Sequence, residues 1–142
     1  YYTAHWSIVG TDDTRWTDSS KSKSIYDPCP SGWRVPDGGN TVGVWATAST
    51  SYTYVDYSYD KTNVGMDFSG EFGSAHSIWY PAAGFRIGVN GKLDAIGLGN
   101  YWSVSTFNVK AYSLAIFDGD GGYDPSFDSY RANGYSVRCV KE

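Results

Sequence analysis

The chain has 142 residues, a hydrophobic fraction of 41% and a net charge of −4, which together indicate one folded domain and exclude a disordered chain. The acidic balance and the lack of a basic stripe exclude nucleic acid as a partner. No apolar run approaches the length of a transmembrane helix, so the sequence predicts a protein that does not span a membrane.

Strand patterns outnumber helix patterns along the chain. The 17 glycines and 5 prolines interrupt every long window, so the best helix candidate is the short segment Val42–Ser49. Alternating or strand-like side chains predict six strands, which are His5–Gly10, Ser51–Tyr59, Ser77–Gly88, Gly99–Ser105, Lys110–Phe117 and Gly134–Lys141.

Two local signals refine this strand pattern. Pro81 lies within Ser77–Gly88 and removes a backbone donor, so this strand is expected to bend or to lie at a sheet edge. The segment Val89–Lys92 contains Asn-Gly, the strongest short turn signal, and it predicts a hairpin.

The segment Asp118–Gly134, between the last two predicted strands, is expected to be a long loop. It combines Tyr and Phe with Asp, Ser and Gly, a composition typical of binding surfaces, and loops of this length usually have a function. We expect Tyr123, Phe127 and Tyr130 to be exposed, because a loop backbone is costly to bury. The alternative is that the loop folds over the sheet and its rings form a small core.

The two cysteines, Cys29 and Cys139, lie near opposite ends of the chain. Abundant Tyr, Gly and Ser, sparse Lys and a single methionine, Met66, are typical of an exported protein. In an oxidising compartment we expect a Cys29–Cys139 disulfide, whereas in a reducing cell both residues would be buried thiols.

Four spaced elements support a resemblance to a known family. They are the run "KSIYDPCPSGWRVP" around Tyr26–Pro36, then Trp79–Arg86, Gly99–Ser105 and Arg131–Glu142. In this order they resemble the Fibrobacter succinogenes major paralogous domains, C-type-lectin-like surface domains of Bacteroidetes and Fibrobacter. One departure is "DGGNTVGVWATAS" after Pro36, which is too rich in glycine for the helix that the family places there.

The resemblance implies a fold of the α+β class, rich in strands and loops, with adjacent chain ends held by the disulfide. It also implies that residues 1–142 form a single C-type-lectin-like domain, the C-terminal module of a longer surface or pilus protein. Such a protein is expected to be exported to the cell surface, the outer membrane or a fimbrial tip.

The sequence favours no catalytic chemistry. A Gly-x-Ser-x-Gly motif is absent, His5 and His76 are far apart in sequence, and the disulfide would occupy both cysteines. No enzyme activity and no cofactor are therefore expected. Calcium is the alternative, because Asp118, Asp120 and Asp124 lie on a glycine-rich segment, although the pattern does not match an EF-hand loop.

The interpretation is a non-catalytic, adhesin-like module that binds a protein or glycan ligand on another cell or host. Its composition also resembles that of the variable proteins of diversity-generating retroelements, whose C-terminal region is diversified. The alternative is a structural pilus subunit or capping domain without a specific ligand. The candidate ligand-binding residues are Phe107, Asn108, Asp120, Tyr123, Asp124, Phe127, Asp128 and Tyr130.

Overall fold

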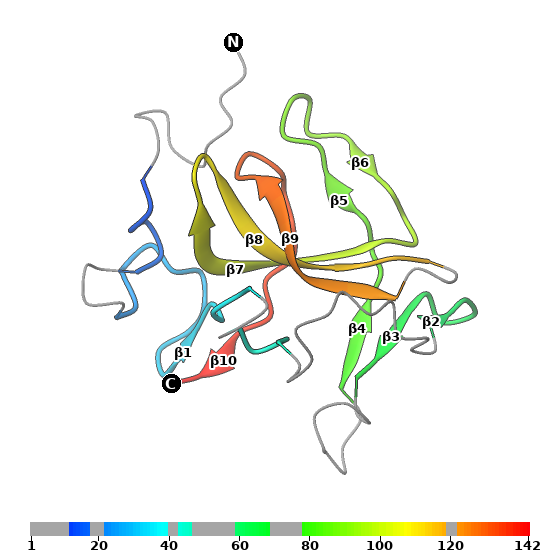
Figure 1. The fold of residues 1–142 in the computed structure, drawn as a ribbon, viewed down its shortest axis with the longest axis horizontal. Coiled ribbons are helices and arrows are strands. Elements are labelled where there is room, and N and C mark those ends of the chain that lie inside the picture. Colours follow the sequence, from blue (N-terminus) through cyan, green and yellow to red (C-terminus); the bar gives the residue numbers. More distant parts are fainter. Residues whose placement is uncertain (1–11, 18–21, 40–42, 47–58, 69–77, 119–121) are drawn as a thin grey trace.

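The structure is a computed structural model that describes residues 12–17, 22–39, 43–46, 59–68, 78–118 and 122–142. Within these ranges the chain forms strands arranged in four small antiparallel sheets, with the β7-β8-β9 sheet at the centre of the molecule (Figure 1). The strands are β1 Trp33–Arg34, β2 Tyr59–Asp60, β3 Gly65–Asp67, β4 Trp79–Pro81, β5 Phe85–Arg86, β6 Leu93–Asp94, β7 Gly99–Phe107, β8 Lys110–Ile116, β9 Tyr123–Tyr130 and β10 Val140–Lys141.

The strand- and loop-rich character expected from the sequence is confirmed, but the described residues contain no helix. Of the helix candidate Val42–Ser49, the described residues 43–46 form a turn in which the amide of Ala46 donates to the carbonyl of Gly43 at 2.9 Å. A Cβ atom on Gly43 would lie 2.6 Å from the carbonyl oxygen of Gly39, so the backbone approaches itself too closely here for a larger residue. The α+β expectation is therefore wrong in its helical part for the described residues.

The central sheet is a meander of β7, β8 and β9. Its first two strands confirm the sequence prediction, since Gly99–Ser105 and Lys110–Phe117 correspond to β7 and β8. Tyr101 lies opposite Leu114, and Asn100 lies opposite Ala115. Because side chains alternate along a strand, these two pairs point to opposite faces of the sheet.

One face of the central sheet packs on the hydrophobic core. Tyr101 and Tyr80 meet edge to face with ring centroids 4.9 Å apart, and the indole of Trp45 donates to the hydroxyl of Tyr80 at 3.0 Å. Polar tips of buried aromatic residues are thus satisfied inside the core. The core cluster comprises Trp45, Met66, Phe68, Tyr80, Tyr101, Leu114 and Ile116.

The local signals at Pro81 and Asn90-Gly91 are confirmed. β4 ends at Pro81 and is an outer strand of the β2-β3-β4 sheet. The expected strand Ser77–Gly88 therefore divides into β4 and β5 in its described part, with Gly84 at a φ of 76° between them. The Asn-Gly turn connects β5 to β6, and the amide of Gly91 donates to the carbonyl of Ile87 at 2.8 Å.

The segment expected to be a loop after Asp118 is a strand over most of its length. β9 covers Tyr123–Tyr130 and pairs with β8 from Ile116↔Tyr123 to Lys110↔Tyr130. The register shifts between Ala115↔Asp124 and Ser113↔Phe127, so Pro125 falls in a bulge. A bulge removes the need for a ladder donor at this position, which is why the strand tolerates proline.

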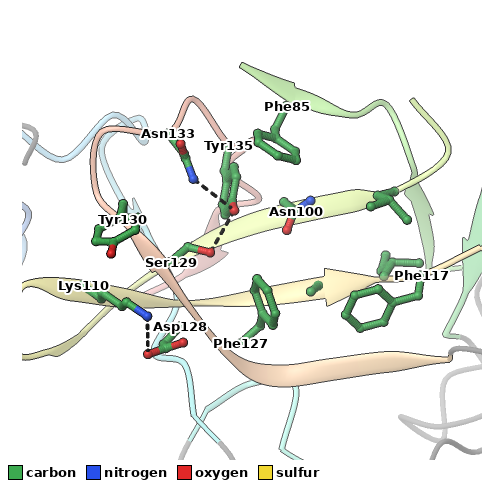
Figure 2. A pocket seen from close by; sticks show the side chains of 13 residues that line it. Phe85, Asn100, Lys110, Phe117, Phe127, Asp128, Ser129, Tyr130, Asn133 and Tyr135 are labelled. Carbon is green, nitrogen blue, oxygen red and sulfur yellow. Dashed lines mark hydrogen bonds and ion pairs between the residues drawn. The ribbon is translucent and has the colours of Figure 1, made fainter. Parts of the chain in front are cut away.

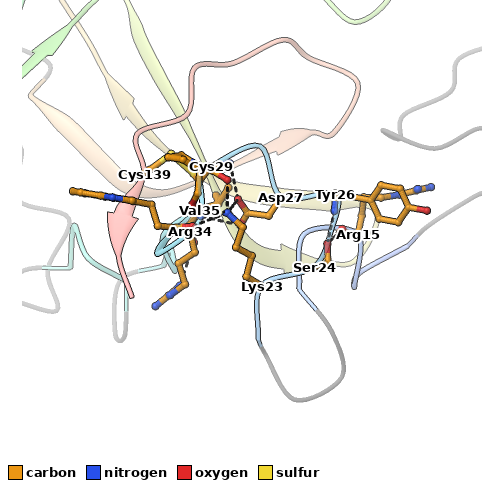
Figure 3. A network of polar contacts seen from close by, with 11 residues as sticks. Arg15, Lys23, Ser24, Tyr26, Asp27, Cys29, Arg34, Val35 and Cys139 are labelled. Carbon is orange, nitrogen blue, oxygen red and sulfur yellow. Dashed lines mark hydrogen bonds and ion pairs between the residues drawn. A yellow bond between two sulfur atoms is a disulfide. The ribbon is translucent and has the colours of Figure 1, made fainter.

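The two cysteine-containing segments are joined as expected. Cys29 and Cys139 form a disulfide with their Cα atoms 5.8 Å apart, and β1 pairs with β10 beside it. We call Lys23, Asp27, Cys29, Val35 and Cys139, with their contacts, the clamp (Figure 3).

Buried polar groups of the clamp are paired with one another. The Asp27 carboxylate accepts from the amide of Cys29 at 2.8 Å and from the amide of Val35 at 3.0 Å. The Lys23 ammonium donates to the carbonyls of Cys29, Pro30 at 3.0 Å and Trp33 at 2.7 Å. The run "YDPCPSGWRVP" is therefore a folded loop held from inside by one carboxylate and one ammonium group.

Candidate ligand-binding site

A cavity of about 360 Å³ lies on the face of the central sheet that points away from the core (Figure 2). This volume is in the lower part of the range typical of small-molecule sites. We call it the β8–β9 pocket; its lining consists of Phe85, Leu98, Asn100, Lys110, Ala115, Ile116, Phe117, Phe127, Asp128, Ser129, Tyr130, Asn133 and Tyr135.

The floor of the β8–β9 pocket comes from short side chains on three neighbouring strands. Asn100 on β7 lies opposite Ala115 on β8, and Ser129 on β9 contributes a third short side chain. Because large residues of these strands, such as Tyr101 and Leu114, point into the core instead, the outer face is left concave.

Two pairs of aromatic rings form opposite walls of the pocket. Figure 2 shows Phe85 and Tyr135 on one side and Phe117 and Phe127 on the other, with Asn100 between them. The centroids are 5.1 Å apart in the first pair and 6.0 Å apart in the second, both with edge-to-face geometry.

The wall formed by Phe85 and Tyr135 is held firmly. The Tyr135 ring stacks on the buried Trp102 ring with a centroid distance of 4.4 Å. Its hydroxyl lies 2.8 Å from the hydroxyl of Ser129 and 3.4 Å from the amide nitrogen of Asn133. The second wall is more open, since Phe127 is 37% exposed.

The side chain of Asn100 differs from the other buried polar groups nearby. Asn100 is only 6% exposed, and within the described part of the chain no group forms a hydrogen bond with its side-chain amide. Its backbone carbonyl, in contrast, accepts from the amide of Ser136 at 3.1 Å. The amide atoms of Asn100 are not among the fully buried, unpaired side-chain atoms of the described residues. They are therefore accessible from the pocket, where they can hydrogen-bond to water or to a ligand.

The charged side chains that line the pocket neutralise each other. The ammonium of Lys110 lies 3.0 Å from the Asp128 carboxylate and 5.3 Å from the centroid of the Tyr130 ring. The nearby Arg131 is buried and pairs with Asp13 away from the lining. The β8–β9 pocket is therefore electrically neutral among its described residues.

The structure brings together only part of the residue set predicted from the sequence. Phe127, Asp128 and Tyr130 line the pocket, and Phe127 and Tyr130 are exposed as expected. Phe107 and Asn108 lie at the β7–β8 turn, outside the lining. Asp120 is outside the described residues.

Tyr123 and Asp124 are placed differently from the expectation. Tyr123 is partly buried, and its ring contacts the core residue Phe68 edge to face at 4.9 Å. The expectation that Tyr123 is exposed is therefore wrong, because pairing of β9 with β8 directs its ring to the core. Asp124 is half-buried and accepts from the amide of Ser126 at 2.8 Å, a local turn contact within the bulge.

Several lining residues had no functional prediction from the sequence. Phe85, Asn100 and Tyr135 lie in the predicted strands Ser77–Gly88, Gly99–Ser105 and Gly134–Lys141. One available signal was the alternation in Gly99–Ser105, which places Asn100 on the face opposite to Tyr101. The missed residues are Phe85, Leu98, Asn100, Lys110, Ala115, Ile116, Phe117, Ser129, Asn133 and Tyr135.

Among the described residues, no group of three or more His, Cys, Asp or Glu side chains is arranged to hold a metal ion. Of the calcium alternative, Asp118 and Asp124 are described and Asp120 is not. No helix in the described ranges has the length and apolar character needed to cross a membrane.

Comparisons of the chain with protein-family models, with curated protein sequences and with solved structures gave no match.

Proposed function

We propose that this domain is a non-catalytic ligand-binding module of the adhesin type. The observation that carries the proposal is the β8–β9 pocket, which combines aromatic walls, a neutral lining and one amide side chain, that of Asn100, that forms no hydrogen bond within the described residues and is accessible from the pocket. Pockets that are mostly apolar, with a few well-placed polar groups, are the usual form of ligand sites. The ligand is a protein or a glycan on another cell or host.

The setting that we propose is the bacterial cell surface, the outer membrane or a fimbrial tip. The disulfide supports it, because such bonds form and persist in oxidising compartments. The four elements that resemble the Fibrobacter succinogenes major paralogous domains support it as well. In this proposal residues 1–142 are the C-terminal module of a longer surface protein.

The proposed fold assignment is a C-type-lectin-like domain. It is supported by the pairing of β1 with β10, which brings an early segment beside the last one, and by the loop-rich character of the chain. A variable protein of a diversity-generating retroelement is a more specific form of the same proposal. Its support is the aromatic and polar composition of residues 107–133.

The proposal predicts binding that depends on the pocket. Fluorescently labelled, disulfide-intact domain should bind a subset of cells, glycans or extracellular proteins in a screening panel, and Phe127→Ala should weaken that binding by about tenfold or more. Tyr26→Ala is the matched control, because Tyr26 is a 59% exposed aromatic residue outside the pocket lining. Binding that is absent, or equally strong in Phe127→Ala, would contradict the proposal.

A structural pilus subunit or cap is the second candidate. It is favoured by exposed apolar side chains at the β7–β8 turn, where Phe107 is 46%, Val109 47% and the neighbouring Tyr130 55% exposed. Such clusters mark contact sites between proteins. Self-association in sedimentation experiments that Phe107→Ser abolishes and Phe127→Ala leaves intact would favour this candidate.

A further inference from the structure

We infer that the β8–β9 pocket holds the ring of a neutral sugar residue, without a metal ion. This inference rests on the proposed function and names the chemical class of its ligand. Three features of the pocket lead to it: the balance of charge, the arrangement of the rings and the side-chain amide of Asn100.

The charges of the lining favour a neutral ligand. Lys110 and Asp128 are the charged residues of the lining, and they form an ion pair at 3.0 Å. An anionic ligand would have to separate this pair or approach the Asp128 carboxylate, and a cationic ligand would have to approach the Lys110 ammonium. Each approach carries a like-charge cost that a neutral ligand avoids.

The rings favour a flat ligand with an apolar face. The Phe85–Tyr135 and Phe117–Phe127 pairs lie on opposite sides of the floor (Figure 2). A pyranose ring presents one face of C–H groups to an aromatic ring while its hydroxyl groups project from the rim. Burial of that face against the walls is favourable, and the rim stays available for hydrogen bonds.

The amide of Asn100 favours a ligand with adjacent donors and acceptors. A side-chain amide offers two N–H donors and one carbonyl acceptor, and two neighbouring hydroxyl groups of a sugar match both. Asn100 is 6% exposed and lines the floor, with no hydrogen-bond partner for its amide among the described residues. The hydroxyls of Ser129 and Tyr135, 2.8 Å apart, extend the polar strip along the same floor.

An apolar peptide side chain fits these features less well. It would cover the aromatic walls but leave the Asn100 amide buried and unpaired, which costs binding free energy. A tyrosine side chain has a hydroxyl group and is the best peptide competitor, so it provides the contrasting probe in the experiment.

The experiment is saturation-transfer difference NMR with the disulfide-intact domain. The probes are neutral hexoses, N-acetylhexosamines and their disaccharides at millimolar concentration, with N-acetyltyrosinamide and sialic acid as contrasting probes. Saturation should reach the C–H protons of at least one neutral sugar. Chelator should leave the signal unchanged, and Asn100→Ala should weaken the affinity about tenfold.

Matched variants separate a binding role of Asn100 from a structural one. Asn90→Ala, in the exposed β5–β6 turn, should retain the affinity of the wild type. The midpoint of urea unfolding of Asn100→Ala should stay close to that of the wild type, because the amide forms no hydrogen bond to the described residues that the variant would remove. A lower midpoint together with unchanged sugar affinity would assign Asn100 to the framework and overturn the inference.

The remaining outcomes distinguish this inference from the proposed function. If Phe127-dependent binding to cells survives enzymatic removal of their glycans, the binding function stands and the sugar inference falls. If N-acetyltyrosinamide or sialic acid is the probe that requires Asn100, the ligand class is wrong. If neither sugars nor cells bind, both proposals fail.

Discussion

The clamp and the β8–β9 pocket use buried polar groups in opposite ways. In the clamp, the carboxylate of Asp27 and the ammonium of Lys23 form hydrogen bonds with backbone groups of the same loop. In the pocket, Asn100 is a largely buried residue whose amide has no hydrogen-bond partner among the described residues and is accessible from the cavity. The first arrangement fixes a loop, and the second leaves hydrogen-bonding capacity for a molecule from outside.

The largest expected effect concerns the disulfide of the clamp. Replacing both Cys29 and Cys139 by Ser should lower the free energy of unfolding by about 4 kcal/mol, because the bond closes a loop with a sequence separation of 110. Urea unfolding of the wild type and the double variant measures the difference, and reductant should affect only the wild type. A loss below about 1 kcal/mol would show that the clamp holds without its covalent bond.

The next effect concerns the carboxylate inside the clamp. Asp27→Ala should lower the free energy of unfolding by about 3 kcal/mol, because it leaves the amides of Cys29 and Val35 without their acceptor and the Lys23 ammonium without its opposite charge. Asp37→Ala is the control from the same region, since the Arg34–Asp37 pair lies near the surface and its loss should cost below about 1 kcal/mol. Thermal unfolding measures both variants. Equal losses of unfolding free energy in Asp27→Ala and Asp37→Ala would contradict the contrast between buried and surface carboxylates.

Tyr101, the neighbour of Asn100 on β7, provides a pH-dependent comparison. Burial raises the pKa of the Tyr101 phenol from 10.0 to about 12, and its hydroxyl donates to the carbonyl of Pro81 at 2.6 Å. Below pH 10 the phenol is protonated in both the folded and the unfolded state. Between about pH 10 and 12 the unfolded chain loses this proton more readily, so the free energy of unfolding should fall by at most about 3 kcal/mol.

The pH effect is measured by urea unfolding at a series of alkaline pH values. Tyr101→Phe should reduce the slope of the unfolding free energy against pH in this range. If the free energy of unfolding falls equally steeply with pH in the wild type and in Tyr101→Phe, groups other than Tyr101 cause the alkaline loss of stability.

The smallest effects distinguish the two faces of β9. Tyr123→Ala should cost about 2 kcal/mol, since its ring packs against Phe68 in the core. Tyr130→Ala should change the free energy of unfolding by no more than about 0.5 kcal/mol. Similar losses in the two variants would mean that β9 does not separate a core face from an exposed face.

Much of the framework was predictable from local patterns. The alternation in Gly99–Ser105 and Lys110–Phe117 predicted β7 and β8, and Asn90-Gly91 predicted the β5–β6 hairpin. The composition of the chain and the positions of Cys29 and Cys139 in the two family-like end motifs predicted the disulfide. These signals are local or compositional, so they did not depend on knowing the tertiary structure.

β9 and the pocket could not be predicted in the same way. Pro125 and the Asp- and Ser-rich composition of the segment indicate a loop, and only pairing with β8 shows that a bulge accommodates the proline. The pocket collects residues from β7, β8, β9 and the segments around Phe85 and Tyr135. Its lining therefore depends on contacts between residues that are far apart in the sequence, and local periodicity does not reveal such contacts.

The bulge in β9 has a consequence for solubility. β9 is an outer strand of the three-stranded central sheet. An outer strand with unpaired backbone N–H and C=O groups can form hydrogen bonds with a strand of another copy of the chain. Here Pro125 has no amide hydrogen to offer, and its carbonyl already accepts from the amide of Gly39 at 3.2 Å. The kink thus discourages edge-to-edge aggregation beside an open aromatic surface, so that surface can remain exposed to solvent.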